Sequence, residues 1–285
     1  MKLLRKIGIG IAVVGLIVVV LATGLHRGWF VQRQTSDEIA ALLEPHMQIF
    51  AAGPRAPLAL LFHGCGHDRD HQKYWGQKLQ AAGITAAVID SYSGRGLTTP
   101  EKIQGVCRGR ELWGAQRAGD VVVALDLVKQ LGYVSDNVTL IGWSHGGWSI
   151  MDAFAFNPPN GWPIGLAPSP NLSVAEVNQV VLFYPYCGFG TRTASSGWQH
   201  KPNVLALLAE TDRVVGETAC PKMLTHLSDS GQQVTTHIYP GVDHAFDVEV
   251  VTTSNDWPRV SDPVAAKAGL EDALRRVVRF INSST

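Results

Sequence analysis

Two spacings of hydrophobic residues follow one another along most of this chain. Short apolar runs rich in β-branched side chains predict buried strands at Leu58–Phe62, Ile84–Ile89, Val138–Trp143, Val180–Tyr184, Val204–Leu208 and Val234–Tyr239. Segments with helical spacing lie between them and predict helices near Asp70–Ala82, Ala115–Leu131, Gly147–Asn157, Cys220–Asp229 and Pro263–Ile281. Buried strands that alternate with helices indicate an α/β fold, with a mostly parallel central sheet flanked by helices.

The first thirty residues carry a different pattern, which predicts a membrane segment. Lys2, Arg5 and Lys6 precede an uncharged apolar run over residues 7–25. At about 1.5 Å per residue, this run approaches the roughly 30 Å hydrocarbon thickness of a bilayer, so we expect an uncleaved signal anchor over residues 1–30. The alternative is a signal peptide that is cleaved after Gly24 and releases a secreted protein.

Both alternatives place the rest of the chain outside the cytoplasm, on the periplasmic or extracellular side, because the positive cluster stays cytoplasmic. Residues 31–56 are polar and interrupted by proline and glycine. They predict a stalk or linker with a short helical pattern at Asp37–Leu43 and one strand near His46–Phe50. Residues 57–285 then form one large domain. The 24 basic and 24 acidic residues balance, so we expect no nucleic-acid partner.

A nucleophile motif stands between a predicted strand and a predicted helix. The segment Gly142-Trp143-Ser144-His145-Gly146 has the G-x-S-x-G form, and a strand before it and a helix after it are the context that this motif requires. So abrupt a turn strains the serine backbone, and side chains two positions away would collide. The pattern predicts Ser144 as a nucleophile; an ordinary glycine-rich turn is the alternative.

A serine hydroxyl needs an imidazole to accept its proton and a carboxylate to orient that imidazole. After a G-x-S-x-G serine, the acid precedes the histidine in the chain. Asp212 follows the strand Val204–Leu208 and His244 follows Val234–Tyr239, so both emerge at the sheet edge where Ser144 lies. We therefore predict a catalytic triad of these three residues. The competing acids are Asp243, Asp247 and Glu210.

The tetrahedral intermediate of such a reaction needs backbone donors for its oxyanion. The N–H of His145 is one candidate, and the N–H of Cys65, in the loop after the strand Leu58–Phe62, is the second. Other side chains near the same edge are predicted to bind the substrate. These are His63, Tyr92, Arg95 and Tyr186.

Five motifs occur in order along the chain: LFHGCG (Leu61–Gly66), DSYSGRG (Asp90–Gly96), GWSHGG (Gly142–Gly147), FYP (Phe183–Pro185) and YPGVDHAFD (Tyr239–Asp247). As an ordered set they resemble the dienelactone hydrolase family, and the similarity runs from about Leu58 to Ile281. The resemblance implies an α/β-hydrolase fold without a metal. The positions that match the catalytic residues of the family are Ser144, Asp212 and His244.

This chain departs from the family pattern at two places. The name-giving enzymes carry a cysteine at the elbow, held by a glutamate in an early loop, whereas this chain has Ser144 and Gly64 there. They also grip a substrate carboxylate with arginines; Arg95 could serve as one, but the segment after His244 offers no second. We therefore expect hydrolysis of a small-molecule ester or lactone through an acyl-enzyme, rather than dienelactone hydrolysis itself.

Three other functions fit parts of the pattern. An exported protein of this fold could act as a peptidase or thioesterase, or could bind a ligand without turnover, although a complete triad argues against the last. A group of potential ligands could hold a metal, but its spacing matches no known zinc motif, so we expect no metal and no cofactor. That group comprises His63, Cys65, His67, Asp68, Asp70 and His71.

The four cysteines allow three pairings if all are bonded. In the fold that the resemblance implies, the strands before Cys65 and Cys107 are neighbours, and so are those before Cys187 and Cys220. An exported domain meets an oxidising compartment. We therefore predict the disulfides Cys65–Cys107 and Cys187–Cys220; four buried free thiols are the alternative.

Overall fold

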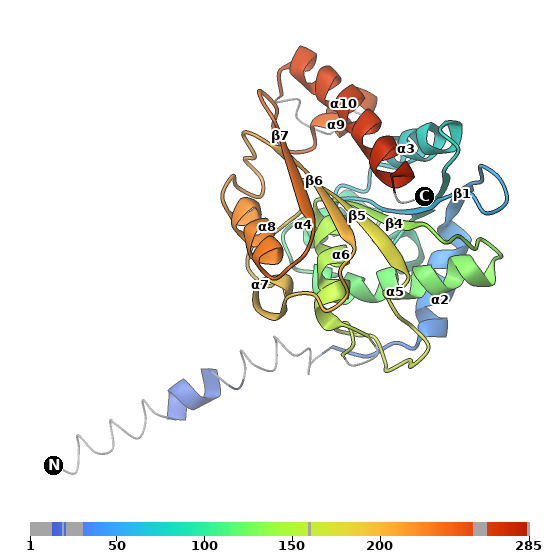
Figure 1. The fold of residues 1–285 in the computed structure, drawn as a ribbon. Coiled ribbons are helices and arrows are strands. Elements are labelled where there is room, and N and C mark those ends of the chain that lie inside the picture. The colour runs from blue at the N-terminus through green and yellow to red at the C-terminus, as the bar shows by residue number, and fades with distance from the viewer. Residues whose placement is uncertain (1–12, 19, 21–30, 159–160, 253–260, 284–285) are drawn as a thin grey trace, which may run out of the picture.

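In the part of the chain that the structure describes, seven strands form one sheet (Figure 1). The structure is a computed structural model and describes residues 13–18, 20, 31–158, 161–252 and 261–283. The strand order is β1-β3-β2-β4-β5-β6-β7, and each neighbouring pair is parallel except β1 with β3. The strands are β1 (Gln48–Phe50), β2 (Leu58–Phe62), β3 (Thr85–Ile89), β4 (Val138–Trp143), β5 (Val177–Phe183), β6 (Asn203–Ala209) and β7 (Val234–Tyr239).

Helices cover both faces of this sheet. They are α2 (Ser36–Leu43), α3 (Arg69–Ala81), α4 (Pro100–Cys107), α5 (Gly114–Gln130), α6 (His145–Phe156), α7 (Thr193–Ser196), α8 (Ala219–Asp229), α9 (Phe246–Val251) and α10 (Pro263–Asn282), with 3₁₀ turns η1 (Glu44–His46) and η2 (Ser93–Arg95). Because successive strand side chains point to opposite faces, Leu60 and Phe62 pack toward α2, α5, α6 and α8. Leu61 packs toward α3, α9 and α10 on the other face.

The predicted mostly parallel sheet with flanking helices is confirmed, with boundaries that differ from the predicted ones, notably at the starts of β5 and α6. β5 begins at Val177 rather than Val180, because the polar Gln179 is buried and accepts a hydrogen bond from Thr139 Oγ1 at 3.1 Å. α6 begins at His145 rather than Gly147. Glycines in its first turn weaken the helical pattern of the sequence, although the helix starts directly after the nucleophile motif.

The stalk predicted over residues 31–56 is wrong for residues 36–50, which belong to the fold. α2 begins with a capping box at Thr35 and buries Ile39 and Leu43 in the core beside α5. β1 then adds an antiparallel edge strand next to β3. The sequence predicted both elements but not that they belong to the domain, because each is short and depends on packing against the rest of the fold.

The signal anchor predicted over residues 1–30 lies mostly outside the described residues. Of this segment the structure describes residues 13–18 and 20, which are helical. No helix in the described ranges has the length and apolar character needed to cross a bilayer. The anchor therefore stays a prediction.

Both predicted disulfides are present. Cys65 is bonded to Cys107 and Cys187 to Cys220, with 5.1 Å between the Cα atoms in each pair. The first bridge joins the loop after β2 to the end of α4, and the second joins the loop after β5 to the start of α8. Both therefore tie together loops that follow the carboxyl ends of the sheet strands.

We predict that protein from its native compartment gives only these two linked peptide pairs in non-reducing peptide mapping. The double variant Cys187→Ala/Cys220→Ala should lose about 2–4 kcal/mol of unfolding free energy in urea titration, because the bridge restrains the unfolded chain. Four alkylatable thiols, or a peptide linking Cys65 to Cys187, would contradict the pairing.

Candidate active site

Ser144 stands at the sharp turn between β4 and α6. Its φ of 48° and ψ of −111° lie outside the regions that non-glycine residues usually adopt. The motif glycines permit the turn through close approach: a Cβ at Gly146 would lie 2.0 Å from the Phe62 carbonyl oxygen, and one at Gly142 would lie 2.7 Å from the Gly146 backbone. This turn leaves Ser144 partly exposed at the sheet edge.

The structure brings Ser144, His244 and Asp212 together from the ends of three parallel strands. His244 Nε2 lies 3.0 Å from Ser144 Oγ, and His244 Nδ1 lies 2.8 Å from Asp212 Oδ2. A carboxylate can only accept, so it fixes the proton of His244 on Nδ1 and leaves the Nε2 lone pair facing the serine hydroxyl. His244 and Asp212 are buried, with exposed fractions of 4% and 6%, so water competes little for these hydrogen bonds.

Backbone donors orient the carboxylate of Asp212. Its Oδ1 accepts the N–H groups of Val214 and Val215 at 3.1 and 2.9 Å. Because Oδ1 is held by this turn, Oδ2 is directed toward His244. The loop after β6 therefore places the acid before any substrate binds.

The neighbouring acidic side chains accept hydrogen bonds from backbone N–H groups instead. Asp243 Oδ1 accepts the N–H groups of Arg213 and His244 at 2.9 and 2.7 Å. Glu210 Oε2 accepts the N–H of Gly241 at 2.9 Å. These bonds stabilise the loops on which the triad stands, and the acid that contacts the imidazole is Asp212.

The loop after β2 approaches Ser144 closely. A Cβ added to Gly64 would lie 3.6 Å from Ser144 Cβ, an ordinary contact distance that brings the loop backbone beside the hydroxyl. Cys65 follows Gly64 directly, and His145 opens α6. The backbone N–H groups of Cys65 and His145, which are predicted to bind an oxyanion, therefore lie in two segments that approach each other beside Ser144.

Arg117 in α5 supports this loop and was missed by the sequence interpretation. It is buried, donates from Nε to Ser91 Oγ at 2.8 Å and from Nη1 to the His63 carbonyl oxygen at 2.7 Å. Burial and the Arg117 guanidinium lower the pKa of His145 to about 3, so that imidazole stays neutral. An arginine among the apolar residues of a predicted helix was the available signal.

The structure corrects three of the four predicted substrate-binding side chains. Arg95 donates to both carboxylate oxygens of Asp120, at 3.0 and 2.7 Å. The His63 ring is buried, with Nδ1 2.7 Å from the Gly64 carbonyl oxygen, and Tyr92 is fully buried. Their side chains are packed or bonded within the protein, and a sequence pattern does not distinguish such inward polar groups from those that face a substrate.

Tyr186, the fourth candidate, does lie beside the nucleophile. Its N–H donates to the Ser144 carbonyl oxygen at 3.2 Å, and its ring packs against Trp148 with centroids 4.8 Å apart. Its hydroxyl donates to the carbonyl oxygen of Phe189, whose side chain is 90% exposed. On the other flank, Val214 is 63% exposed on the loop after β6. Two apolar side chains therefore project from loops that border the triad.

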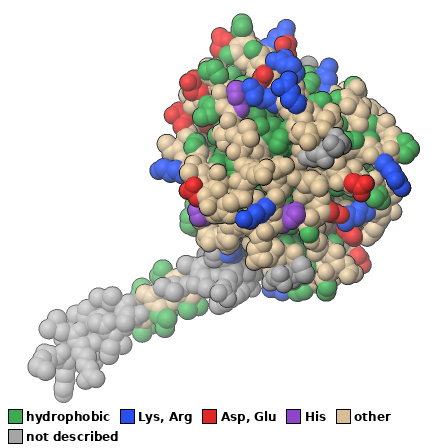
Figure 2. Space-filling view, in the orientation of Figure 1, with side chains coloured by type: hydrophobic (Ala, Val, Ile, Leu, Met, Phe, Trp, Pro, Cys, Tyr) green, Lys and Arg blue, Asp and Glu red, His purple; other side chains and the backbone are tan. Residues whose placement is uncertain are grey.

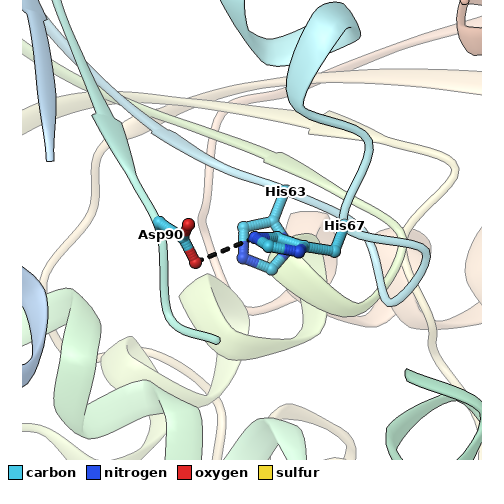
Figure 3. A group of neighbouring side chains, drawn as sticks. All are labelled: His63, His67 and Asp90. Carbon is cyan, nitrogen blue, oxygen red and sulfur yellow. Dashed lines mark hydrogen bonds and ion pairs between the residues drawn. The ribbon is translucent and has the colours of Figure 1, made fainter. Parts of the chain in front are cut away.

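One group of side chains has the composition of a metal site (Figure 3). The ligand atoms of His63, His67 and Asp90 lie within 4.8 Å of one another. These atoms already have partners in the protein: His67 Nε2 lies 2.9 Å from Asp90 Oδ1, which also accepts the N–H groups of Tyr92 and Ser93. Because a cation would have to displace these donors, we assign the group to loop structure.

The other members of the group that was considered as a metal site, and rejected, are dispersed. Cys65 is in a disulfide, and Asp68 caps the first turn of α3 by accepting the N–H of His71. Asp70 is exposed. His71 lies 2.7 Å from the buried Asp247 carboxylate, so this histidine belongs to a different network.

Comparisons with known proteins agree with this architecture. Residues 166–284 match the model of the dienelactone hydrolase family. No curated protein sequence matches the chain. Among solved structures, a dienelactone hydrolase-like promiscuous phosphotriesterase from metagenomic libraries superposes with a TM-score of 0.60 at 15% identity, covering 80% of this chain and 87% of that chain.

Two further structures are similar. A putative dienelactone hydrolase from Klebsiella pneumoniae has a TM-score of 0.54 at 16% identity and covers 79% of this chain and 87% of its own. Esterase 2 from Thermogutta terrifontis has a TM-score of 0.54 at 16% identity, with coverage of 82% and 89%. At these identities the likeness establishes the fold. The chain therefore has an α/β-hydrolase-like fold, and its resemblance to the dienelactone hydrolase family is confirmed by the family match over residues 166–284.

Proposed function

We propose that this protein is a serine hydrolase that cleaves carboxylic ester or lactone bonds through an acyl-enzyme. The observation that carries the proposal is the pair of hydrogen bonds from Ser144 through His244 to Asp212, at 3.0 and 2.8 Å. The match to the dienelactone hydrolase family supports ester hydrolysis, and several structural neighbours are described as esterases.

Acylation follows from the positions of these groups. His244 Nε2 accepts the proton of Ser144 Oγ while that oxygen attacks the ester carbonyl carbon. Asp212 stabilises the imidazolium that forms, and the N–H groups of Cys65 and His145 bind the oxyanion. The imidazolium then gives its proton to the departing alcohol, which leaves the acyl group on Ser144.

Deacylation uses the same base a second time. His244 takes a proton from water, whose oxygen attacks the acyl carbonyl, and the acid is released as Ser144 regains its proton. Thioesters and amides pass through the same acyl-enzyme, so the triad alone leaves open which bond is cleaved fastest. A panel with matched ester, thioester and amide substrates separates these classes.

Organophosphates offer a direct test of the nucleophile. Esterase 2 from Thermogutta terrifontis has been solved phosphoramylated by tabun and phosphorylated by paraoxon. These neighbours support the expectation that paraoxon also labels this protein, with Ser144 as the modified residue. Intact-protein mass spectrometry would detect the adduct, and a non-catalytic module would remain unlabelled.

The reaction is proposed to take place outside the cytoplasm. The positive cluster before residues 7–25 predicts this orientation, and the two disulfides fit an oxidising compartment. Small-molecule esters in that compartment, rather than cytoplasmic metabolites, are the expected substrates.

Replacing Ser144 by alanine should lower the esterase turnover number about 10⁶-fold, because no other group forms the acyl-enzyme. Hydrolysis of p-nitrophenyl acetate measures the loss. Ser149→Ala is the matched control: Ser149 lies in α6, the helix that follows Ser144, and donates to the His145 carbonyl oxygen at 2.8 Å. A Ser144 variant that keeps more than about one hundredth of the rate would overturn the assignment.

Asp212→Asn should reduce turnover about 10⁴-fold, because an amide no longer fixes the protonated nitrogen of His244. Asp243→Asn tests a carboxylate next in sequence to His244 that bonds to backbone N–H groups instead. Initial rates of both variants, corrected for folded protein by circular dichroism, decide the acid. A larger loss in the Asp243 variant would mean that Asp212 is not the orienting acid.

The exposed side chains of Phe189 and Val214 predict a preference for esters with a longer apolar acyl chain. Phe189→Ala should lower kcat/KM for p-nitrophenyl hexanoate about 10-fold while the value for the acetate changes little, because only the longer chain can cover the ring. Val264→Ala, another exposed apolar residue at the start of α10, serves as the control. Equal losses on both esters would argue against contact between Phe189 and the acyl chain.

A further inference from the structure

Three strained turns surround the candidate triad. Ser144, Tyr184 and Ala245 are non-glycine residues with φ angles of 48°, 32° and 61°. Ser144 follows β4, Tyr184 follows the neighbouring strand β5, and Ala245 lies in the loop after β7. Ser144 is itself a member of the candidate triad, and Ala245 is next in sequence to His244. Left-handed conformations at such residues cost about 1–3 kcal/mol each and persist only where surrounding contacts hold them.

One buried carboxylate, two residues after the turn at Ala245, accepts hydrogen bonds from the other two turns. Asp247, two residues after Ala245, is fully buried. Its Oδ1 accepts the hydroxyl of Tyr184, and its Oδ2 accepts the indole N–H of Trp143, the residue before Ser144, at 2.9 Å. Asp247 therefore connects the turn that bears the base to the turn that bears the nucleophile.

Two side chains of α3 also contact the Asp247 carboxylate. His71 Nε2 lies 2.7 Å from Asp247 Oδ2, and Trp75 Nε1 lies 3.1 Å from the same oxygen. Burial works against the charge of this carboxylate, but His71 and the hydrogen bonds from Tyr184 and Trp143 outweigh it and lower the pKa of Asp247. The carboxylate is thus ionised and holds donors from four other residues in the described part of the chain.

Tyr184 transmits this arrangement to the base. Its hydroxyl is bonded to Asp247, and its ring packs against the imidazole of His244 with centroids 4.6 Å apart in an edge-on arrangement. A shift of the ring would therefore shift the imidazole. Ser144 Oγ and His244 Nε2 are only 3.0 Å apart, so a small displacement weakens the proton transfer between them.

We infer that Asp247 is a positioning residue for the hydrolysis: through Tyr184 and Trp143 it fixes the His244 imidazole against Ser144 Oγ. The inference rests on the proposed function, since it assigns no contact between Asp247 and the substrate. Its consequence is that the triad depends on a polar network buried on the side of the sheet covered by α3, α9 and α10.

Tyr184→Phe is the sharpest test because it removes one hydroxyl and keeps the ring. We expect kcat for p-nitrophenyl acetate to fall on the order of 10- to 100-fold with KM within about twofold, since placement of the base is disturbed and substrate binding is not. Paraoxon labelling of Ser144 should slow in parallel. Asp247→Asn should give a larger fall in kcat, because an amide group would face the indole and imidazole donors.

Tyr239→Phe is the matched control. Tyr239, the last residue of β7, also donates to a carboxylate, Asp272 at 3.1 Å, but that carboxylate pairs with Arg275 and Arg276 of α10. Rates are expressed per active site titrated with paraoxon, and melting temperatures are measured alongside. If Tyr184→Phe lowers the melting temperature like the control but keeps kcat within twofold, Asp247 is merely structural and the inference fails.

The wild-type protein separates this failure from a failure of the proposed function. A wild-type protein without turnover or paraoxon labelling would remove the proposed hydrolysis and this inference together. An active, labelled wild-type protein with an unaffected Tyr184→Phe variant would remove this inference alone. If Asp247→Asn does not fold, the Tyr184 variant and its control still decide the question.

Discussion

The close approach of the Ser144 turn to the loop after β2 is the constraint on which the rest of the site depends. Glycine at positions 142 and 146 is required because a Cβ at either would meet backbone atoms at 2.7 and 2.0 Å. Once this turn is fixed at the end of β4, the parallel order of the sheet determines where the other groups can stand. An acid after β6 and a base after β7 then reach the same edge without any long insertion.

The strands and the triad could be predicted because each rests on a local signal. Buried parallel strands read as continuous apolar runs, and the rule that chemistry follows strand ends selected Ser144, Asp212 and His244. The polar interior could not be predicted in the same way. Arg117 and Asp120 face inward within an apolar helix, and their partners come from loops far away in the sequence. A single sequence shows that such residues exist but not which groups they bond.

The same limit explains why His63, Tyr92 and Arg95 were taken for substrate contacts. Polar side chains at strand ends can face the substrate or brace the loops behind it, and burial decides between the two. In this protein the loops after β2 and β3 are stabilised by hydrogen bonds that Asp90 accepts and Arg117 donates, whereas the loops after β5 and β6 expose apolar side chains. The two flanks of the triad thus differ in character: one is held by buried hydrogen bonds, and the other presents apolar side chains to solvent.

If the predicted signal anchor holds the chain in a bilayer, the point at which the chain enters the domain limits how far the folded body could lie from the lipid. Gln34 is bonded through its N–H to the Gly165 carbonyl oxygen, so the folded body begins at about that residue. If the run over residues 7–25 is embedded in lipid, only eight residues lie between Leu25 and Gln34. Fully extended, that length of chain reaches about 30 Å. Such a short linker would confine the folded domain to the layer of solvent next to the lipid headgroups. There it would meet esters that partition into or out of the bilayer before esters that diffuse in bulk solvent.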